Sequence, residues 1–294
     1  MHRKDLKELA GDPNFISGIY NYCDRWCERC PFTARCLVYA TEKADEELGD
    51  PDTHDINNEK FWRKLEGIFR ETRELIREWA EEAGVDLDAA EAEAAQAEHE
   101  QERDEAKQHQ LSEWARDYTQ MVQRWFEGEF AVEQNVHDDL TGKSRNAGDD
   151  INVSDAIEVI RWYQFFIAAK VYRALMGIER GTASDDSAGD EIFEDLEFDL
   201  DEADDSAEET DLTEALAEAA GGDSDGSAKI ALISIDRSLS AWRVMQSSFA
   251  EKTDTIMPML LELERLRRGM EQLFPQARDF IRPGFDEMQS EFVS

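Results

Sequence analysis

Residues 229–249 read KIALISIDRSLSAWRVMQSSF, and their large apolar side chains recur every three or four positions. This spacing places them along one face of an α-helix. The stripe consists of Leu232, Ile235, Leu239, Trp242, Met245 and Phe249. A second stripe with the same spacing contains Ile256, Leu260, Leu263, Leu266 and Met270. Because proline lacks a backbone N–H, Pro258 is expected to kink or divide the two stripes.

Earlier segments repeat the pattern. Residues 57–83 and 111–125 each carry an apolar stripe at helical spacing, and residues 155–179 are apolar enough for a buried core helix. Residues 89–110 are rich in Ala, Glu and Gln, which predicts an exposed helical extension. No segment alternates as a strand would. The fold class is therefore predicted as all-α, an antiparallel bundle of about four long helices.

The segment 181–228 has a different composition. It contains 19 Asp and Glu and no Lys or Arg, which is about half of the formal charge of −37. Self-repulsion and scarce apolar content predict a long, disordered acidic insertion. Apolar residues are interleaved in it, so residues 185–214 are either a docking segment for a basic protein partner or a solubilising linker. These apolar residues are Ile192, Phe193, Leu196, Phe198 and Leu200.

The overall charge and the lack of targeting features limit the classes of partner. A charge of −37 repels phosphate backbones and anionic membrane surfaces, so neither nucleic acid nor membrane is expected to bind. No apolar run approaches the roughly 20 residues of a membrane span. The N-terminal residues have no apolar core typical of a secretory signal. We therefore expect a cytoplasmic protein.

These patterns predict four parts along the chain. Residues 1–50 form a Cys-rich helical metal-binding segment, and residues 51–180 contain the first three long helices of the bundle. Residues 181–228 are the acidic linker, and residues 229–294 contain the C-terminal helices. No nucleophile, base and orienting group that would support an enzyme is recognised.

All four cysteines of the chain lie in one short stretch, at Cys23, Cys27, Cys30 and Cys36. On a continuous helix the first three share one face, and Pro31 would end that helix so that the fourth returns toward them. This pattern predicts that all four cysteines bind one metal centre as its ligands. In a reducing compartment, clustered cysteines are more often metal ligands or redox groups than disulfides.

The predicted helix also bears on the kind of metal. Cys23 and Cys30 would stand about 10.5 Å apart along the helix axis. Sulfurs around one tetrahedral zinc are only roughly 3.8 Å apart, given Zn–S bonds near 2.3 Å. A [4Fe-4S] cluster is larger and accepts more widely spaced thiolates. The cofactor is therefore predicted to be a [4Fe-4S] cluster, with zinc and a metal-free thiol site as alternatives.

The run Cys27-Glu-Arg-Cys30-Pro-Phe-Thr-Ala-Arg-Cys36 resembles the [4Fe-4S] loop of the helix-hairpin-helix DNA glycosylases. In that family the last three ligands are separated by two and then five residues, often with proline after the middle one. The resemblance implies cluster ligation at Cys27, Cys30 and Cys36, and by position at Cys23. It does not extend to glycosylase activity, because the gap before Cys27 is three residues rather than six and the family's hairpin is absent.

The spacing Cys-x-x-x-Cys-x-x-Cys of Cys23, Cys27 and Cys30 also resembles the radical-SAM triad, but that chemistry needs a strand-rich partial barrel. Two functions are favoured, and an enzyme that uses an unrecognised cavity of the bundle is a third alternative. The first is a redox, sensing or structural protein carrying a [4Fe-4S] cluster. The second is a zinc-stabilised or metal-free scaffold that recruits a partner through its acidic segment.

Overall fold

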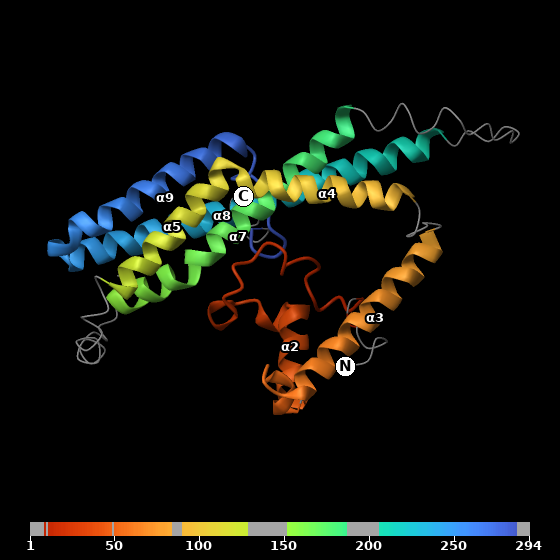
Figure 1. The fold of residues 1–294 in the computed structure, drawn as a ribbon, viewed down its shortest axis with the longest axis horizontal. Helices are drawn as coiled ribbons and strands as arrows, with labels where there is room; N and C mark the ends of the chain where they lie inside the picture. Colours follow the sequence, from red (N-terminus) through yellow and green to blue (C-terminus); the bar gives the residue numbers. More distant parts are fainter. Residues whose placement is uncertain are drawn as a thin grey trace, which may run out of the picture. The chain divides into compact units, whose positions relative to one another are not determined.

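The computed structural model describes residue 9 and residues 11–48, 50–83, 90–128, 152–186 and 206–286. In this part of the chain the regular secondary structure is entirely helical, which confirms the all-α prediction (Figure 1). Among the described helices, none combines the length and apolar content that crossing a membrane requires.

The α-helices are α2 (Leu37–Leu48), α3 (Glu59–Ala83), α4 (Ala90–Gln108), α5 (Gln110–Glu127), α7 (Val153–Asp186), α8 (Ser206–Ser248) and α9 (Thr253–Leu273). Short 3₁₀ turns are η1 (Cys27–Arg29), η2 (Thr33–Arg35), η3 (Pro51–His54) and η5 (Ala250–Lys252). The side chain of Asn152 caps α7, since it accepts a hydrogen bond of 2.9 Å from the backbone N–H of Asp155.

Backbone contacts divide the chain into two compact units. The first contains residues 1–101 together with residues 283–294, so it is assembled from both ends of the chain. The second contains residues 102–282.

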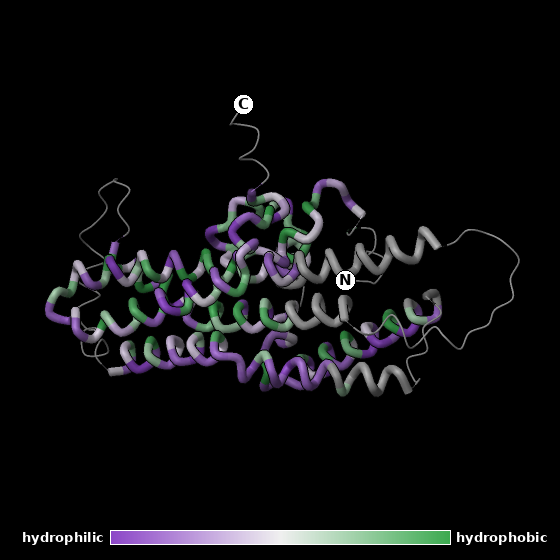
Figure 2. The backbone as a smooth tube through the Cα atoms, turned by 90° about the horizontal axis from the view of Figure 1, so that it is seen from above, coloured by the Kyte–Doolittle hydropathy of each residue, from purple (hydrophilic) through white to green (hydrophobic). Residues whose placement is uncertain are grey.

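In the second unit α5, α7, α8 and α9 lie side by side around one core (Figure 1). Hydrogen bonds define the directions: Arg173 pairs with Asp223 and Arg237 with Tyr163, so α7 and α8 run antiparallel. Figure 2 shows hydrophobic and hydrophilic positions alternating along the helical backbone, as expected when each helix turns one apolar face to the core.

An aromatic group lies at the centre of this core. Trp242 and Tyr118 are fully buried, and the indole N–H of Trp242 donates to the Tyr118 hydroxyl at 3.1 Å. The Trp125 ring meets Trp242 edge to face at 5.1 Å, and its own N–H donates to Thr255 at 3.1 Å. Each buried indole thus satisfies its polar group while filling the core. Loss of solvation on burial raises the pKa of Tyr118 to about 12.

Helices α7 and α8 approach each other closely at Gly177 and Ser224. A Cβ on Gly177 would stand 2.8 Å from the Cβ and 3.1 Å from the Cα of Ser224. The Ser224 hydroxyl donates to the Ala174 carbonyl at 2.8 Å. Small side chains therefore bring the two backbones together, and a hydrogen bond holds the register between them.

The lengths of α7 and α8 correct the prediction of a disordered acidic insertion. Order was expected to begin at residue 229, yet α8 begins at Ser206 and α7 continues to Asp186. Residues 224–228 are buried apart from the half-buried Asp225. Residues 206–222 are rich in Ala, which favours helix, and Arg173 supplies a counter-charge to Asp223 at 2.9 Å. Residues 187–205 lie outside the described residues.

The membership of the helical core also differs from the prediction. The stripe at 57–83 does form a helix, α3, but α3 belongs to the first unit rather than to the core with α5, α7 and α8. The fourth helix of that core is α9, because the chain turns at η5 and not at Pro258. Pro258 lies inside α9, near its beginning. A stripe at helical spacing specifies a helix but not the surface on which it packs.

We expect Gly177→Ala to lower the free energy of unfolding of the second unit by about 1–3 kcal/mol, because the added methyl meets the backbone of α8. Gly67→Ala in α3 is the matched control. It meets nothing within 4 Å, so it should stabilise its helix by about 0.5–1 kcal/mol. Thermal melts followed by circular dichroism measure both variants. A Gly177→Ala protein that melts like wild type would contradict the close approach.

Candidate metal centre

The four cysteines lie on turns rather than on a continuous helix, which corrects the predicted local structure. Cys27 begins η1, and Cys30 and Cys36 directly follow η1 and η2 in extended conformations. Cys23 precedes them in a turn. Pro31 and the two short 3₁₀ turns therefore interrupt the segment more often than the helical spacing suggested.

The turn between Cys23 and Cys27 depends on two local features. The Asp24 carboxylate accepts a hydrogen bond of 3.1 Å from the backbone N–H of Trp26. Arg25 has φ of 58°, in the left-handed region that residues with a Cβ seldom adopt. These features keep the backbone between the first two cysteines from continuing as a helix. A strained residue of this kind persists only where its surroundings require it.

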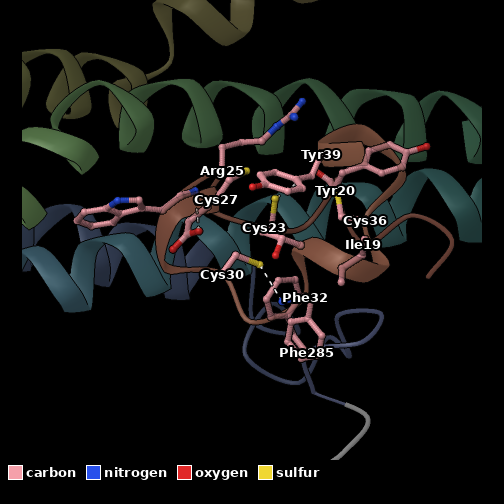
Figure 3. Close-up of a pocket in the computed structure, with 13 residues that line it drawn as sticks. Ile19, Tyr20, Cys23, Arg25, Cys27, Cys30, Phe32, Cys36, Tyr39 and Phe285 are labelled. Carbon is pink, nitrogen blue, oxygen red and sulfur yellow. Dashed lines mark hydrogen bonds between the residues drawn. The ribbon is translucent and has the colours of Figure 1, made fainter. Parts of the chain in front are cut away.

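As a result all four cysteines line one pocket. Cys23, Cys27, Cys30 and Cys36 enter it from different turns, and each is half-buried (Figure 3). In the described part of the chain, however, no three His, Cys, Asp or Glu side chains stand close enough together to hold a metal ion. The thiols share a pocket without forming a finished ligand set, so their role as ligands stays a prediction.

Two sulfur atoms have hydrogen-bond partners on the backbone. The N–H of Phe32 points at Cys30 Sγ over 3.4 Å, and Cys23 Sγ donates to the Tyr20 carbonyl at 3.5 Å. An N–H directed at sulfur stabilises negative charge there, and such bonds tune the potential of iron–sulfur centres. The Cys30 sulfur therefore accepts a backbone hydrogen bond, whereas the Cys23 sulfur donates one.

The electrostatics of the pocket oppose free thiolates. Burial raises the pKa of Cys27, and the neighbouring Cys23, Glu42, Cys36 and Cys30 raise it further. The neighbouring thiols and Glu42 are therefore close enough to Cys27 to oppose its ionisation. A bound cation would reverse this balance, because metal ligation deprotonates the thiols and neutralises their charge.

Three arginines lie within this cysteine segment, between the cysteines in the sequence. Arg25 stands 4.0 Å from Glu42, Arg29 lies 4.1 Å above the Trp26 ring, and Arg35 donates to the Asn14 carbonyl at 3.4 Å. All three arginines are exposed, so water screens the compensation that they would offer to the negative charge of four thiolates.

The remaining wall of the pocket is largely apolar. Its apolar and aromatic members are Ile19, Tyr20, Trp26, Phe32, Tyr39 and Phe285. Sequence reasoning missed Phe285, which lies near the opposite end of the chain. Phe285 meets Phe32 edge to face at 5.0 Å.

The segment that brings Phe285 to the pocket has a clear backbone requirement. Gly284 has φ of 76°, and a Cβ there would stand 2.8 Å from the Cδ1 atom of Ile16. Only glycine fits both the conformation and the space. The sequence signal for this segment is the dipeptide Pro283-Gly284. It predicts a turn, but it does not predict which residues the turn packs against.

The predicted partner segment at residues 185–214 is described only at its two ends. Residues 185–186 end α7 and residues 206–214 begin α8. The docking role of this segment stays a prediction.

No family model, curated protein or solved structure matches this chain. The interpretation of the site therefore rests on its own residues.

We expect the metal-free protein to show a raised ionisation midpoint at Cys27. A thiolate reacts with iodoacetamide and a thiol does not, so alkylation should begin at higher pH in the native protein than in the urea-unfolded protein. The raised pKa of Cys27 also makes the stability of the folded segment depend on pH. Neutral Cys27 stabilises the folded segment below the unfolded pKa of about 9, and that stability is lost as pH rises through the folded value.

Mass spectrometry of the peptide that contains Cys27, measured across pH, gives the midpoint independently of steric slowing. Equal midpoints in native and unfolded protein would contradict the opposed ionisation of Cys27.

Proposed function

We propose that Cys23, Cys27, Cys30 and Cys36 together hold one metal centre, and that this centre is a [4Fe-4S] cluster with a redox, sensing or structural role. The single observation that carries the proposal is that all four thiols line one pocket. Because burial and the neighbouring side chains oppose ionisation of Cys27, a bound cation would stabilise its thiolate.

The donor set fits such a cluster in several ways. Four sulfur atoms line the pocket, and no histidine is among the described residues around it, which suits iron–sulfur chemistry. The N–H of Phe32 points at Cys30, and aromatic side chains exclude water from part of the wall. When bound, the cluster would supply one-electron redox chemistry. The residues of this chain would hold it, screen it from water and set its potential through hydrogen bonds and exposure.

One structural observation favours the second candidate, a zinc-stabilised scaffold. The separation of Cys23 and Cys30 along a helix argued against zinc, but both residues lie in turns. Turns allow sulfurs to close around a single ion. The case for the cluster over zinc therefore rests on the spacing of Cys27, Cys30 and Cys36 and not on helix geometry.

The proposed setting is consistent with this chemistry. Reduced, clustered thiols favour the cytoplasm. The core of α5, α7, α8 and α9 serves as an antiparallel four-helix bundle that provides a stable body. The chain's charge disfavours nucleic acid and favours a basic protein partner, for which residues 185–214 are the proposed contact.

Anaerobic purification followed by iron, sulfide and zinc analysis tests the proposal. We expect about four iron and four sulfide per chain, with broad visible absorption that bleaches on reduction. Cys30→Ser should lose most of the metal and become protease-sensitive within residues 12–44, while the α5, α7, α8 and α9 helices keep their circular dichroism. Thr33→Ser, which also alters the pocket wall but removes no sulfur, is the matched control.

The results separate the candidates. About one zinc per chain with no colour would favour the scaffold over the cluster. A Cys30→Ser protein with undiminished metal would remove Cys30 from the ligand set. Wild-type protein without either metal would leave a thiol site and overturn the proposal.

A further inference from the structure

Helix α3 exposes large apolar side chains from Trp62 to Ile76, whereas Ala80 near its C-terminal end is buried. Trp62, Ile68, Phe69 and Ile76 are 53%, 50%, 57% and 48% exposed. Within the first unit, the substantial contact of α3 among the described elements is with η3, at the helix N-terminus. Water therefore faces most of the length of the stripe, which is typical of a surface that binds a partner.

The stripe repeats every seven residues. Trp62, Phe69 and Ile76 are seven apart, and Leu65 and Thr72 follow the first two by three positions. These are the a and d positions of a heptad, which form the seam of a two-stranded coiled coil. The neighbouring g positions are apolar as well, and the e positions carry Glu66 and Arg73.

We propose that the α3 helices of two copies of this chain pair antiparallel along this stripe. In an antiparallel pair the e positions of the two helices face each other. Glu66 then faces Arg73 of the partner subunit, and Arg73 faces Glu66 of the partner subunit, so both charges are matched by the two-fold symmetry. A parallel pair would instead place these charges against the apolar g positions.

The apolar positions match in the same register. Leu65 lies at the level of the partner's Ile76, and Phe69 at the level of the partner's Thr72. The g positions bring Ile68 opposite the partner's Leu75. A large side chain thus meets a smaller one in the central layers, which suits close packing between helices.

Net charge favours α3 over the rest of the chain as the contact. Residues 59–83 carry six Lys and Arg and seven Asp and Glu, so they are nearly neutral in a chain of −37. Two copies would repel each other over most other surfaces. The same charge disfavours an anionic membrane as the occupant, although aromatic side chains on a helix with basic residues are also found at membrane surfaces.

Charge exchange tests the pairing in the full-length protein. Glu66→Arg places a second guanidinium beside the partner's Arg73, and Arg73→Glu places two carboxylates together. Each variant alone should raise the dissociation constant of the dimer roughly tenfold, because two attractive pairs become repulsive. Mixing the two variants in equal amounts should restore association close to the wild-type value, since every facing pair is again opposite in sign.

Matched controls and a seam variant complete the test. Glu71→Arg and Arg70→Glu make the same charge changes at positions away from the seam, and they should change the dissociation constant less than about twofold. Phe69→Glu should abolish the dimer while circular dichroism shows the helix content retained. Analytical ultracentrifugation at about 0.15 M salt measures each case.

Several outcomes would overturn the proposal. Wild-type protein that stays monomeric up to about 1 mM has no useful self-affinity. A mixture that associates no better than its components would exclude the Glu66–Arg73 pairing. If Phe69→Glu lowers the melting temperature of a monomer, the stripe is covered by its own chain. If the monomer binds anionic vesicles through Phe69, a membrane is the occupant.

Discussion

The close approach of α7 and α8 at Gly177 and Ser224 is the constraint on which the second unit depends. It aligns two long helices at one register, and the Ser224 hydroxyl fixes that register at the Ala174 carbonyl. Further buried serines lie along α8. They are Ser227, Ser234 and Ser238. With α8 so placed, Trp242 reaches Tyr118 of α5, and α9 closes the core through Trp125 and Thr255.

The first unit obeys a different constraint. Its cysteine segment has little regular structure and few deeply buried side chains, with Ile19 the described exception near the pocket. Segments of this kind are commonly stabilised by metal or disulfide cross-links, since apolar burial alone does not offset their conformational entropy. The unit also needs residues from the C-terminal end, where Gly284 packs on Ile16 and Phe285 on Phe32. The proposed metal centre would therefore hold together a structure built from both ends of the chain.

Sequence reasoning identified the helices well and their partners poorly. The stripes at 57–83 and 229–249 look alike, yet one is half exposed on α3 and the other is the centre of the core on α8. Periodicity reports only that one face of a helix is apolar. The cysteines illustrate a second limit. Their spacing suggested a shared helical face, but Pro31 and the left-handed Arg25 produce turns, and the four thiols reach one pocket by another route.

The sequence by itself determined the all-α class, the strong negative charge and the confinement of every cysteine to one segment, because these follow from composition and short-range periodicity. Only the tertiary structure decided that α9 rather than α3 completes the core, that α8 reaches back to Ser206, and that Phe285 lines the cysteine pocket. Each of these depends on contacts between residues distant in the chain. Such contacts are set by the fit of whole surfaces, as where Gly177 admits Ser224, and no local pattern encodes that fit.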